Sequence, residues 1–88
     1  MKSASALLVN QAGLHARASA KFVETASHFS SEISVALGAK QVSGKSILAL
    51  MMLAATCNTE LTLQAEGEDE DAAIKALLDL VADGFGEL

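Results

Sequence analysis

The segment from Gly13 to Arg17, which reads Gly-Leu-His-Ala-Arg, holds the residues whose types and spacing best suit chemistry. His15 lies where a glycine-bearing loop meets the predicted start of a helix at about Ala16. The first N–H groups of a helix have no partner within it, and the helix dipole adds partial positive charge there. We therefore expect the His15 ring to stay neutral and nucleophilic near pH 7. An anion attached to the ring would find hydrogen-bond donors already in place.

Arg17, two residues further on, could add a charge-assisted contact to the same anion. A histidine that accepts a phosphoryl group needs this environment, because it must be a neutral nucleophile before transfer and must support a dianion afterwards. The alternative interpretation is that His15 is an ordinary loop or capping residue. No Ser-His-Asp or metal-binding pattern competes for it, since His28 and Cys57 are the only other histidine and the only cysteine.

Changes in hydrophobic periodicity predict short, alternating elements around this segment. Strands are predicted where apolar and polar residues alternate, over residues 3–9, 32–37, 40–43 and 60–66. Helices are predicted where apolar residues recur at helical spacing, from about 16 to 28–31, from 46 to about 53, and after the acidic run 68–71. The apolar faces expected for the first and third helices are Ala18, Phe22, Ala26 and Phe29, and Ile74, Leu77, Leu78, Val81 and Phe85. Gly84 is a natural C-terminal stop.

The predicted order is β-α-β-β-α-β-α, which indicates an α+β fold. We expect an open-faced two-layer sandwich, with a four-stranded antiparallel sheet and three helices on one face. At 88 residues the chain has the length of one domain, spanning residues 1–88. A two-layer domain of this size rarely holds an enzyme pocket of roughly 300 Å³, which favours a binding or carrier module.

Composition excludes several function classes. The net charge of −5 argues against a non-specific nucleic-acid binder. The longest apolar run, residues 47–55, is far shorter than the roughly 20 residues of a membrane span, so no membrane insertion is expected. A single cysteine, Cys57, excludes an internal disulfide and a multi-cysteine metal site, and we expect a cytoplasmic protein.

The second predicted helix is apolar on almost every side, so one stripe cannot bury all of it. We expect Ile47, Leu48 and Met51 to be partly exposed beside His15 and to dock partners, with methionine suited to a surface that accepts several of them. The alternative is that the whole helix is core. Ser46 precedes this helix and is explained structurally as its N-cap.

Three motifs resemble the HPr phosphocarrier family. Residues 13–17 and 20–23, Gly-Leu-His-Ala-Arg and Ala-Lys-Phe-Val, resemble its active-site segment. Residues 44–47 and 51–55 resemble its second helix and the preceding serine, and residues 65–70 resemble the start of its last helix. The motifs stand in the family's order and spacing over nearly the whole chain.

The resemblance implies a stoichiometric phosphoryl carrier, and not a turnover enzyme, in the phosphoenolpyruvate-dependent phosphotransferase system. Enzyme I would phosphorylate Nδ1 of His15 with assistance from Arg17, and the group would pass to enzyme IIA proteins or domains. No metal or organic cofactor is implied, and we expect a monomer. Partner docking is expected at an apolar set of five residues: Ala16, Ala20, Ile47, Leu48 and Met51.

Two points stay open within the resemblance. Some family members are phosphorylated by HPr kinase at the serine that matches Ser46. The tail, residues 83–87, looks like proteobacterial members, including a nitrogen-branch paralogue that acts as a phosphorylation-dependent regulatory binding module. Two departures also stand near the histidine. Ala18 replaces a common proline, which could make the loop less rigid, and Ala12 replaces a polar residue.

Overall fold

A computed structural model describes residues 1–87, and within that range the chain forms four strands and three α-helices, followed by a short 3₁₀ turn. The bounds are β1 (Lys2–Leu7), α1 (Ala16–Ala26), β2 (Glu32–Leu37), β3 (Lys40–Ser43), α2 (Ile47–Met52), β4 (Glu60–Glu66), α3 (Glu70–Ala82) and η1 (Gly84–Gly86). The sheet order is β1-β4-β2-β3 and every neighbouring pair is antiparallel. The predicted fold class and element order are confirmed.

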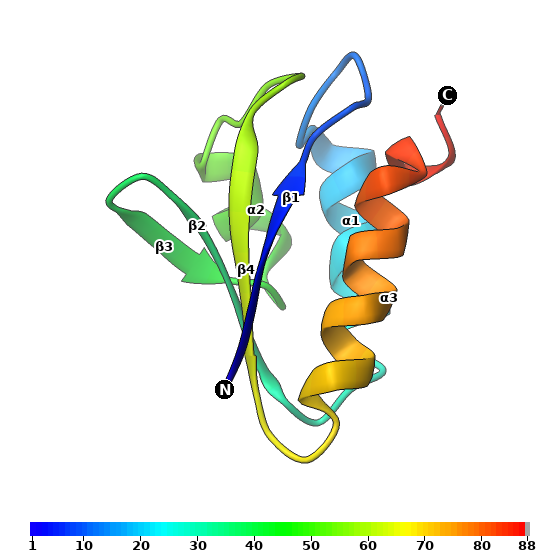
Figure 1. The fold of residues 1–88 in the computed structure, drawn as a ribbon. Coiled ribbons are helices and arrows are strands. Elements are labelled where there is room, and N and C mark those ends of the chain that lie inside the picture. Colours follow the sequence, from blue (N-terminus) through cyan, green and yellow to red (C-terminus); the bar gives the residue numbers. More distant parts are fainter. Residues whose placement is uncertain (88) are drawn as a thin grey trace.

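The helices cover one face of the sheet, and the other face is open (Figure 1). Alternation along the strands decides which face is buried. On β4, for example, Leu61, Leu63 and Ala65 are buried, whereas Thr62 and Gln64 are only half-buried. The helices add their apolar stripes to the same core, including Phe22 from α1, Leu50 from α2 and Leu77 from α3.

The first strand is shorter than predicted, ending at Leu7 instead of residue 9. Leu8 still forms hydrogen bonds with the segment before β4. It donates its N–H to the Thr59 carbonyl at 2.9 Å, and its carbonyl accepts the Asn58 N–H at 2.7 Å. Asn58 has φ of 70°, in the left-handed region, so the partner segment turns away and the regular ladder ends there.

The prediction that Gly84 stops the third helix is confirmed, but Phe85 does not lie on the apolar face of that helix, contrary to what its spacing predicts. The helix ends at Ala82, and Gly84 and Phe85 both lie in the left-handed region, at φ of 62° and 57°. The spacing was misleading because Phe85 is buried, at 1% exposure, as a helix residue there would be. Its burial comes instead from a chain reversal that brings the tail back over α1.

The acidic start of α3 holds the helix to the segment before β2, which the hydrophobic periodicity does not predict. Asp69 occupies the N-cap but makes no capping bond. Its carboxylate accepts from the backbone N–H groups of Ser30 and Ser31, at 2.8 and 3.0 Å, and from the Ser31 hydroxyl. These bonds, the Ser31 hydroxyl first, lower the pKa of Asp69 to about 2. The carboxylate thus joins the start of α3 to the segment before β2.

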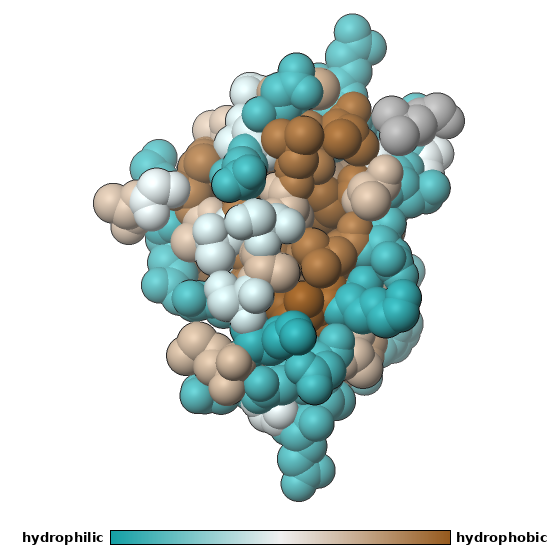
Figure 2. All heavy atoms as spheres, in the orientation of Figure 1, coloured by the Kyte–Doolittle hydropathy of each residue, from teal (hydrophilic) through white to brown (hydrophobic). Residues whose placement is uncertain are grey.

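Apolar side chains also reach the surface between β1 and α3. Figure 2, which looks onto this side, shows the strongly hydrophobic residues gathered there. A shallow hollow of about 360 Å³ lies at this place, with Leu7, Val9 and Leu78 among its lining residues. Within residues 1–87, no helix has both the length and the apolar character needed to cross a membrane.

Candidate functional site

His15 is the N-cap of α1, so its position is set by the helix start itself. Its backbone is extended, with φ of −77° and ψ of −178°. Nδ1 of the ring accepts the N–H of Arg17, in the first turn of the helix, at 3.2 Å. This is a long hydrogen bond that places Nδ1 at the positive end of the helix dipole. The side chain is 32% exposed, so the ring is accessible from solvent.

The loop before His15 is packed tightly enough to fix the direction of the ring. Leu14 is buried and donates its N–H to the Ala55 carbonyl at 3.0 Å. Gly13 has φ of 66°, and a Cβ there would stand 2.4 Å from the Ala55 oxygen. Only glycine fits this approach, which holds the loop against the segment after α2.

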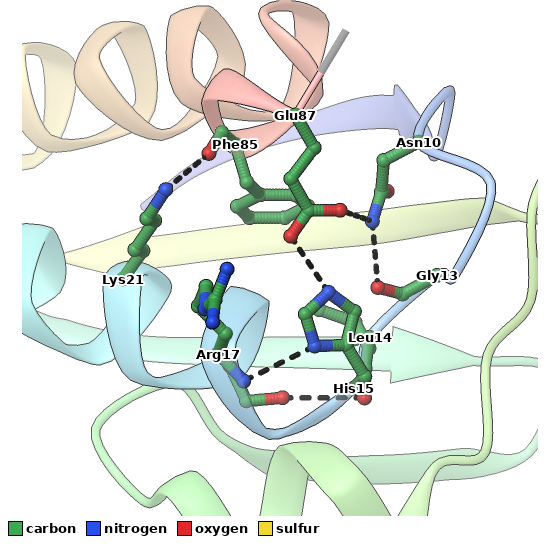
Figure 3. Close-up of polar contacts among 9 residues, drawn as sticks. Asn10, Gly13, Leu14, His15, Arg17, Lys21, Phe85 and Glu87 are labelled. Atoms are coloured by element: carbon green, nitrogen blue, oxygen red, sulfur yellow. Dashed lines mark hydrogen bonds and ion pairs between the residues drawn. The ribbon is translucent and has the colours of Figure 1, made fainter.

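The other ring nitrogen faces the chain's tail. Nε2 lies 2.7 Å from the Glu87 carboxylate, whose second oxygen accepts from the Asn10 amide at 3.0 Å (Figure 3). Asn10 also donates to the Gly13 carbonyl at 2.8 Å. Because Nδ1 accepts an N–H, the proton of the neutral ring belongs on Nε2, where the carboxylate accepts it. The two ring nitrogens therefore have opposite roles.

The tail is held in place by α1. Lys21 donates to the Phe85 carbonyl at 2.6 Å, and the Phe85 side chain is buried. The pKa of Glu87 is lowered, most of all by the hydrogen bond from Asn10 and then by the bond to His15, against an opposing effect of burial. The carboxylate is therefore ionised at neutral pH, as a hydrogen-bond acceptor of His15 must be.

Arg17 is the second residue of α1, two positions after the N-cap, and is exposed. Its guanidinium forms no ion pair with any other residue in the described part of the chain. Figure 3 shows the side chain between Lys21 and His15. It is thus available on the side of the ring where Nδ1 lies.

The apolar residues expected to dock partners are at the surface. Ala16 and Ala20 are exposed on α1, and Ile47, Leu48 and Met51 are 41%, 69% and 40% exposed on α2. Met52, at 69%, joins them, although it was not among the expected residues. The two helices pack against each other, so these side chains belong to neighbouring surfaces. The alternative, that all of α2 is core, is wrong.

Ser46 is the N-cap of α2, as expected. Its hydroxyl accepts the N–H of Ala49 at 3.2 Å, and the residue is half-buried. The second histidine, His28, is exposed just after α1, and Cys57 is half-buried in the turn before β4. Both lie outside the contacts around His15. A hollow of about 560 Å³ over β2, β3 and β4 also lacks His15.

Sequence reasoning did not find Asn10, Lys21 or Glu87 as parts of this site. Asn10 carried one usable signal, because an asparagine directly after a strand is either a turn residue or a buried hydrogen-bonding group. Glu87 carried none, since it contacts His15 across 72 residues of sequence.

The chain is thus an open-faced sandwich in which a partly exposed histidine caps the first helix. Residues 2–83 match the model of a protein family described as the HPr component phosphorylation site of the PTS. The chain belongs to this HPr family, whose members are phosphocarriers of the phosphotransferase system.

Individual relatives agree with the family match. The chain is 51% identical over 80 residues to the phosphocarrier protein HPr of Neisseria meningitidis serogroup A, covering 91% of this chain and 90% of that protein. The HPr of Cupriavidus necator is 46% identical with the same coverage. Among solved structures, a crystal structure of HPr from Thermoanaerobacter tengcongensis superposes with a TM-score of 0.96, at 48% identity, over 100% of this chain and 99% of that chain.

Proposed function

We propose that this chain carries a phosphoryl group on Nδ1 of His15, taking it from phosphorylated enzyme I and passing it to enzyme IIA proteins or domains. The observation that supports this most strongly is the hydrogen bonding of the ring. Nδ1 accepts the Arg17 N–H at 3.2 Å, and Nε2 lies 2.7 Å from the Glu87 carboxylate. A ring nitrogen that accepts a hydrogen bond holds a lone pair, and a lone pair is what a nucleophile needs.

In the proposed transfer, the lone pair of Nδ1 attacks the phosphorus atom of the donor. The new N–P bond forms as the bond between phosphorus and the donor breaks, and the donor keeps that electron pair. The phosphoryl oxygens then take over the Arg17 N–H, and the Arg17 guanidinium offers a charge-assisted contact. The chain supplies positioning and charge stabilisation, and it is phosphorylated once per cycle as a stoichiometric carrier.

We propose that partners dock on the apolar side chains of α1 and α2 beside the ring. Ile47, Leu48 and Met51 project from α2 into solvent, and a cluster of exposed apolar residues usually marks an interaction site. Met51 has a flexible, polarizable side chain that can adapt to a donor and to several acceptors.

The proposal is tested by labelling with radioactive phosphoenolpyruvate and enzyme I. His15→Ala is expected to take up no label. His28→Ala is the matched control, because His28 is the other histidine and is exposed away from the contacts described above. Label on His15→Ala at the wild-type level would overturn the proposal.

Transfer from the labelled protein separates the two branches of the system. Passage of the label to sugar-specific enzyme IIA domains would indicate a transport carrier. Passage only to an enzyme IIA of the nitrogen branch would indicate a regulatory paralogue.

A further inference from the structure

The tail that reaches His15 lies beyond the residues matched by the family model, which end at 83. It is turned back by three successive residues in the left-handed region, Gly84, Phe85 and Gly86, at φ of 62°, 57° and 76°. This conformation is unfavourable for phenylalanine and must be held by its surroundings. Burial of the Phe85 ring and the bond from Lys21 to the Phe85 carbonyl hold it. A defined structure thus delivers Glu87 to the ring.

Asn10 fixes the carboxylate of Glu87 from the other side. Its side chain is fully buried, and both groups that its nitrogen contacts, the Gly13 carbonyl and the Glu87 carboxylate, can only accept hydrogen bonds. The amide must therefore present its NH₂ group to them. Its own oxygen is left without a partner in the described structure, which is costly for a buried polar atom. The bonds from Asn10 to Gly13 and Glu87 thus hold the loop and the tail in place, although the unpaired oxygen of Asn10 destabilises the fold.

The charged groups around this contact come from α1 and from the tail that follows α3. Arg17 and Lys21 belong to α1, and Figure 3 shows both beside the ring and the tail. Asp83 follows α3 and lies, like Lys21, within 4 Å of the position that a Cβ on Gly86 would occupy. Glu87 is the only carboxylate of the described residues that forms an ion pair with His15.

We propose that Glu87, held by Asn10, is a positioning residue for phosphoryl transfer at His15: it keeps the ring proton on Nε2, so that Nδ1 presents its lone pair at the start of α1. This inference rests on the proposed function. In the transfer step the N–P bond forms at Nδ1 while the proton stays on Nε2, and the ring becomes positively charged. The carboxylate stabilises that charge from the edge of the ring that faces away from the phosphoryl group. When the group leaves, the ring keeps the N–P electron pair and is neutral again.

Glu87→Gln tests this, because Asn10 decides which end of the new side chain faces the ring. The NH₂ of Asn10 requires an acceptor, so it takes the glutamine oxygen and leaves the glutamine NH₂ facing Nε2. That donor clashes with a proton on Nε2 and favours the tautomer with the proton on Nδ1. Glu24→Gln is the matched control, since Glu24 is an exposed carboxylate on α1. Glu87→Asp keeps the charge on a shorter side chain. We expect its tautomer share and its phosphorylation rate to lie between those of the wild type and those of Glu87→Gln.

The first measurement is ¹⁵N NMR of the His15 ring in the unphosphorylated protein, at a pH where the ring is neutral. We expect the Nε2–H tautomer in the wild type and in Glu24→Gln, and an increased share of the Nδ1–H tautomer in Glu87→Gln. Wild-type signals in Glu87→Gln would overturn the inference and leave the proposed function intact.

The second measurement is the rate of phosphorylation by enzyme I, together with the pH dependence of hydrolysis of the phosphorylated protein. We expect Glu87→Gln to be phosphorylated about three- to tenfold more slowly, the loss typical of a charge-assisted hydrogen bond in a partly exposed site. The pH at which its hydrolysis is half-maximal should fall, because the protonated ring has lost its stabilising carboxylate. Faster phosphorylation of Glu87→Gln would show that Glu87 obstructs the ring, and would overturn the inference. If the wild type itself took up no label, the proposed function would fall first.

Discussion

Helices α1 and α2 begin in almost the same way, yet only one of these starts is suited to group transfer. In each, an extended residue caps the helix with its side chain, His15 through Nδ1 and Ser46 through its hydroxyl, and each accepts a backbone N–H at 3.2 Å. The difference lies beyond the cap. The imidazole has a second polar edge, which reaches the Glu87 carboxylate at 2.7 Å. A helix start becomes a candidate site when its cap also has a partner that controls its proton.

The largest effect is expected from a substitution that keeps the capping role of residue 15 but removes its nucleophilic ring nitrogen. In His15→Asn, asparagine is a strong N-cap, so the free energy of unfolding should change by no more than about 1 kcal/mol. Phosphorylation by enzyme I should nevertheless fall to background, since the amide cannot replace the ring nitrogen. Labelling and urea unfolding check the two halves of this prediction. A large loss of stability would mean that the ring contributes more to the fold than its capping bond does.

The next effect concerns the surface beside the two helix starts. Leu48→Asp should lower the rate of phosphorylation by enzyme I about tenfold, or about 1.4 kcal/mol, because it places a charge in an apolar contact where Leu48 would be buried. Leu7→Asp is the control, since Leu7 is also an exposed leucine, at 48%, but lies on β1. Equal rates for the two variants would show that α2 does not dock enzyme I.

A smaller effect is expected at Ser46. Ser46→Ala removes the bond to the Ala49 N–H and should lower the free energy of unfolding by about 1 kcal/mol, measured in urea. The rate of phosphorylation at His15 should stay unchanged. Ser46→Asp should recover the stability, because a carboxylate can cap and suits the helix dipole. It should also slow transfer to partners that dock beside Ser46, because it adds a negative charge to that surface, as a phosphate there would. A slower rate in Ser46→Ala would show that the Ser46 hydroxyl contributes to phosphorylation at His15 as well as capping α2.

The smallest effect is expected on stability at low pH and concerns Asp69, the N-cap of the third helix, α3. The folded protein holds the pKa of Asp69 at about 2, below its usual value of 3.8. A depressed pKa gives stability that is present above about pH 4 and is lost as the pH falls toward 2. Urea midpoints measured over this range should therefore fall more steeply for the wild type than for Asp69→Asn. Parallel curves would mean that the bonds to Ser30 and Ser31 do not hold the ionised carboxylate. Comparison with the variant removes the contributions of Glu70 and Glu87, whose pKa values are also lowered.

Local pattern predicted most of this fold. Alternation identified β2, β3 and β4, and helical spacing identified the buried faces of α1 and α3, because these elements are amphipathic and each pattern has one dominant period. The spacing of Phe85 fits α3, and although Gly84 marks the end of the helix, spacing cannot reveal the left-handed backbone of Phe85 that turns the tail back. The ends of elements were less predictable, because contacts from elsewhere in the chain decide them.

The residues of the candidate site likewise include some that the sequence predicts and some that it does not. His15 and Arg17 stand two residues apart, so their relation to a helix start could be read directly from the sequence. Asn10 and Glu87 meet across 77 residues, and their contact exists only after the sheet and helices have assembled. Nothing near Glu87 in the sequence indicates that its carboxylate faces a histidine. Long-range polar contacts of this kind are set by tertiary packing, which periodicity does not describe.

The close approach of Gly13 to Ala55 has a consequence for how the protein meets its partners. The loop that carries the ring is bonded to the chain just after α2, through Leu14 and Ala55 at 3.0 Å. This bond, together with the close approach of Gly13 to Ala55, fixes the position of the His15 loop relative to the end of α2. If partners dock on Met51 and Met52 as proposed, each of them would meet the imidazole at the same distance and in the same direction. Under the proposed function, the donor and the acceptors would then have to match the same arrangement of apolar surface and ring, and they could differ only in the rest of their own surfaces.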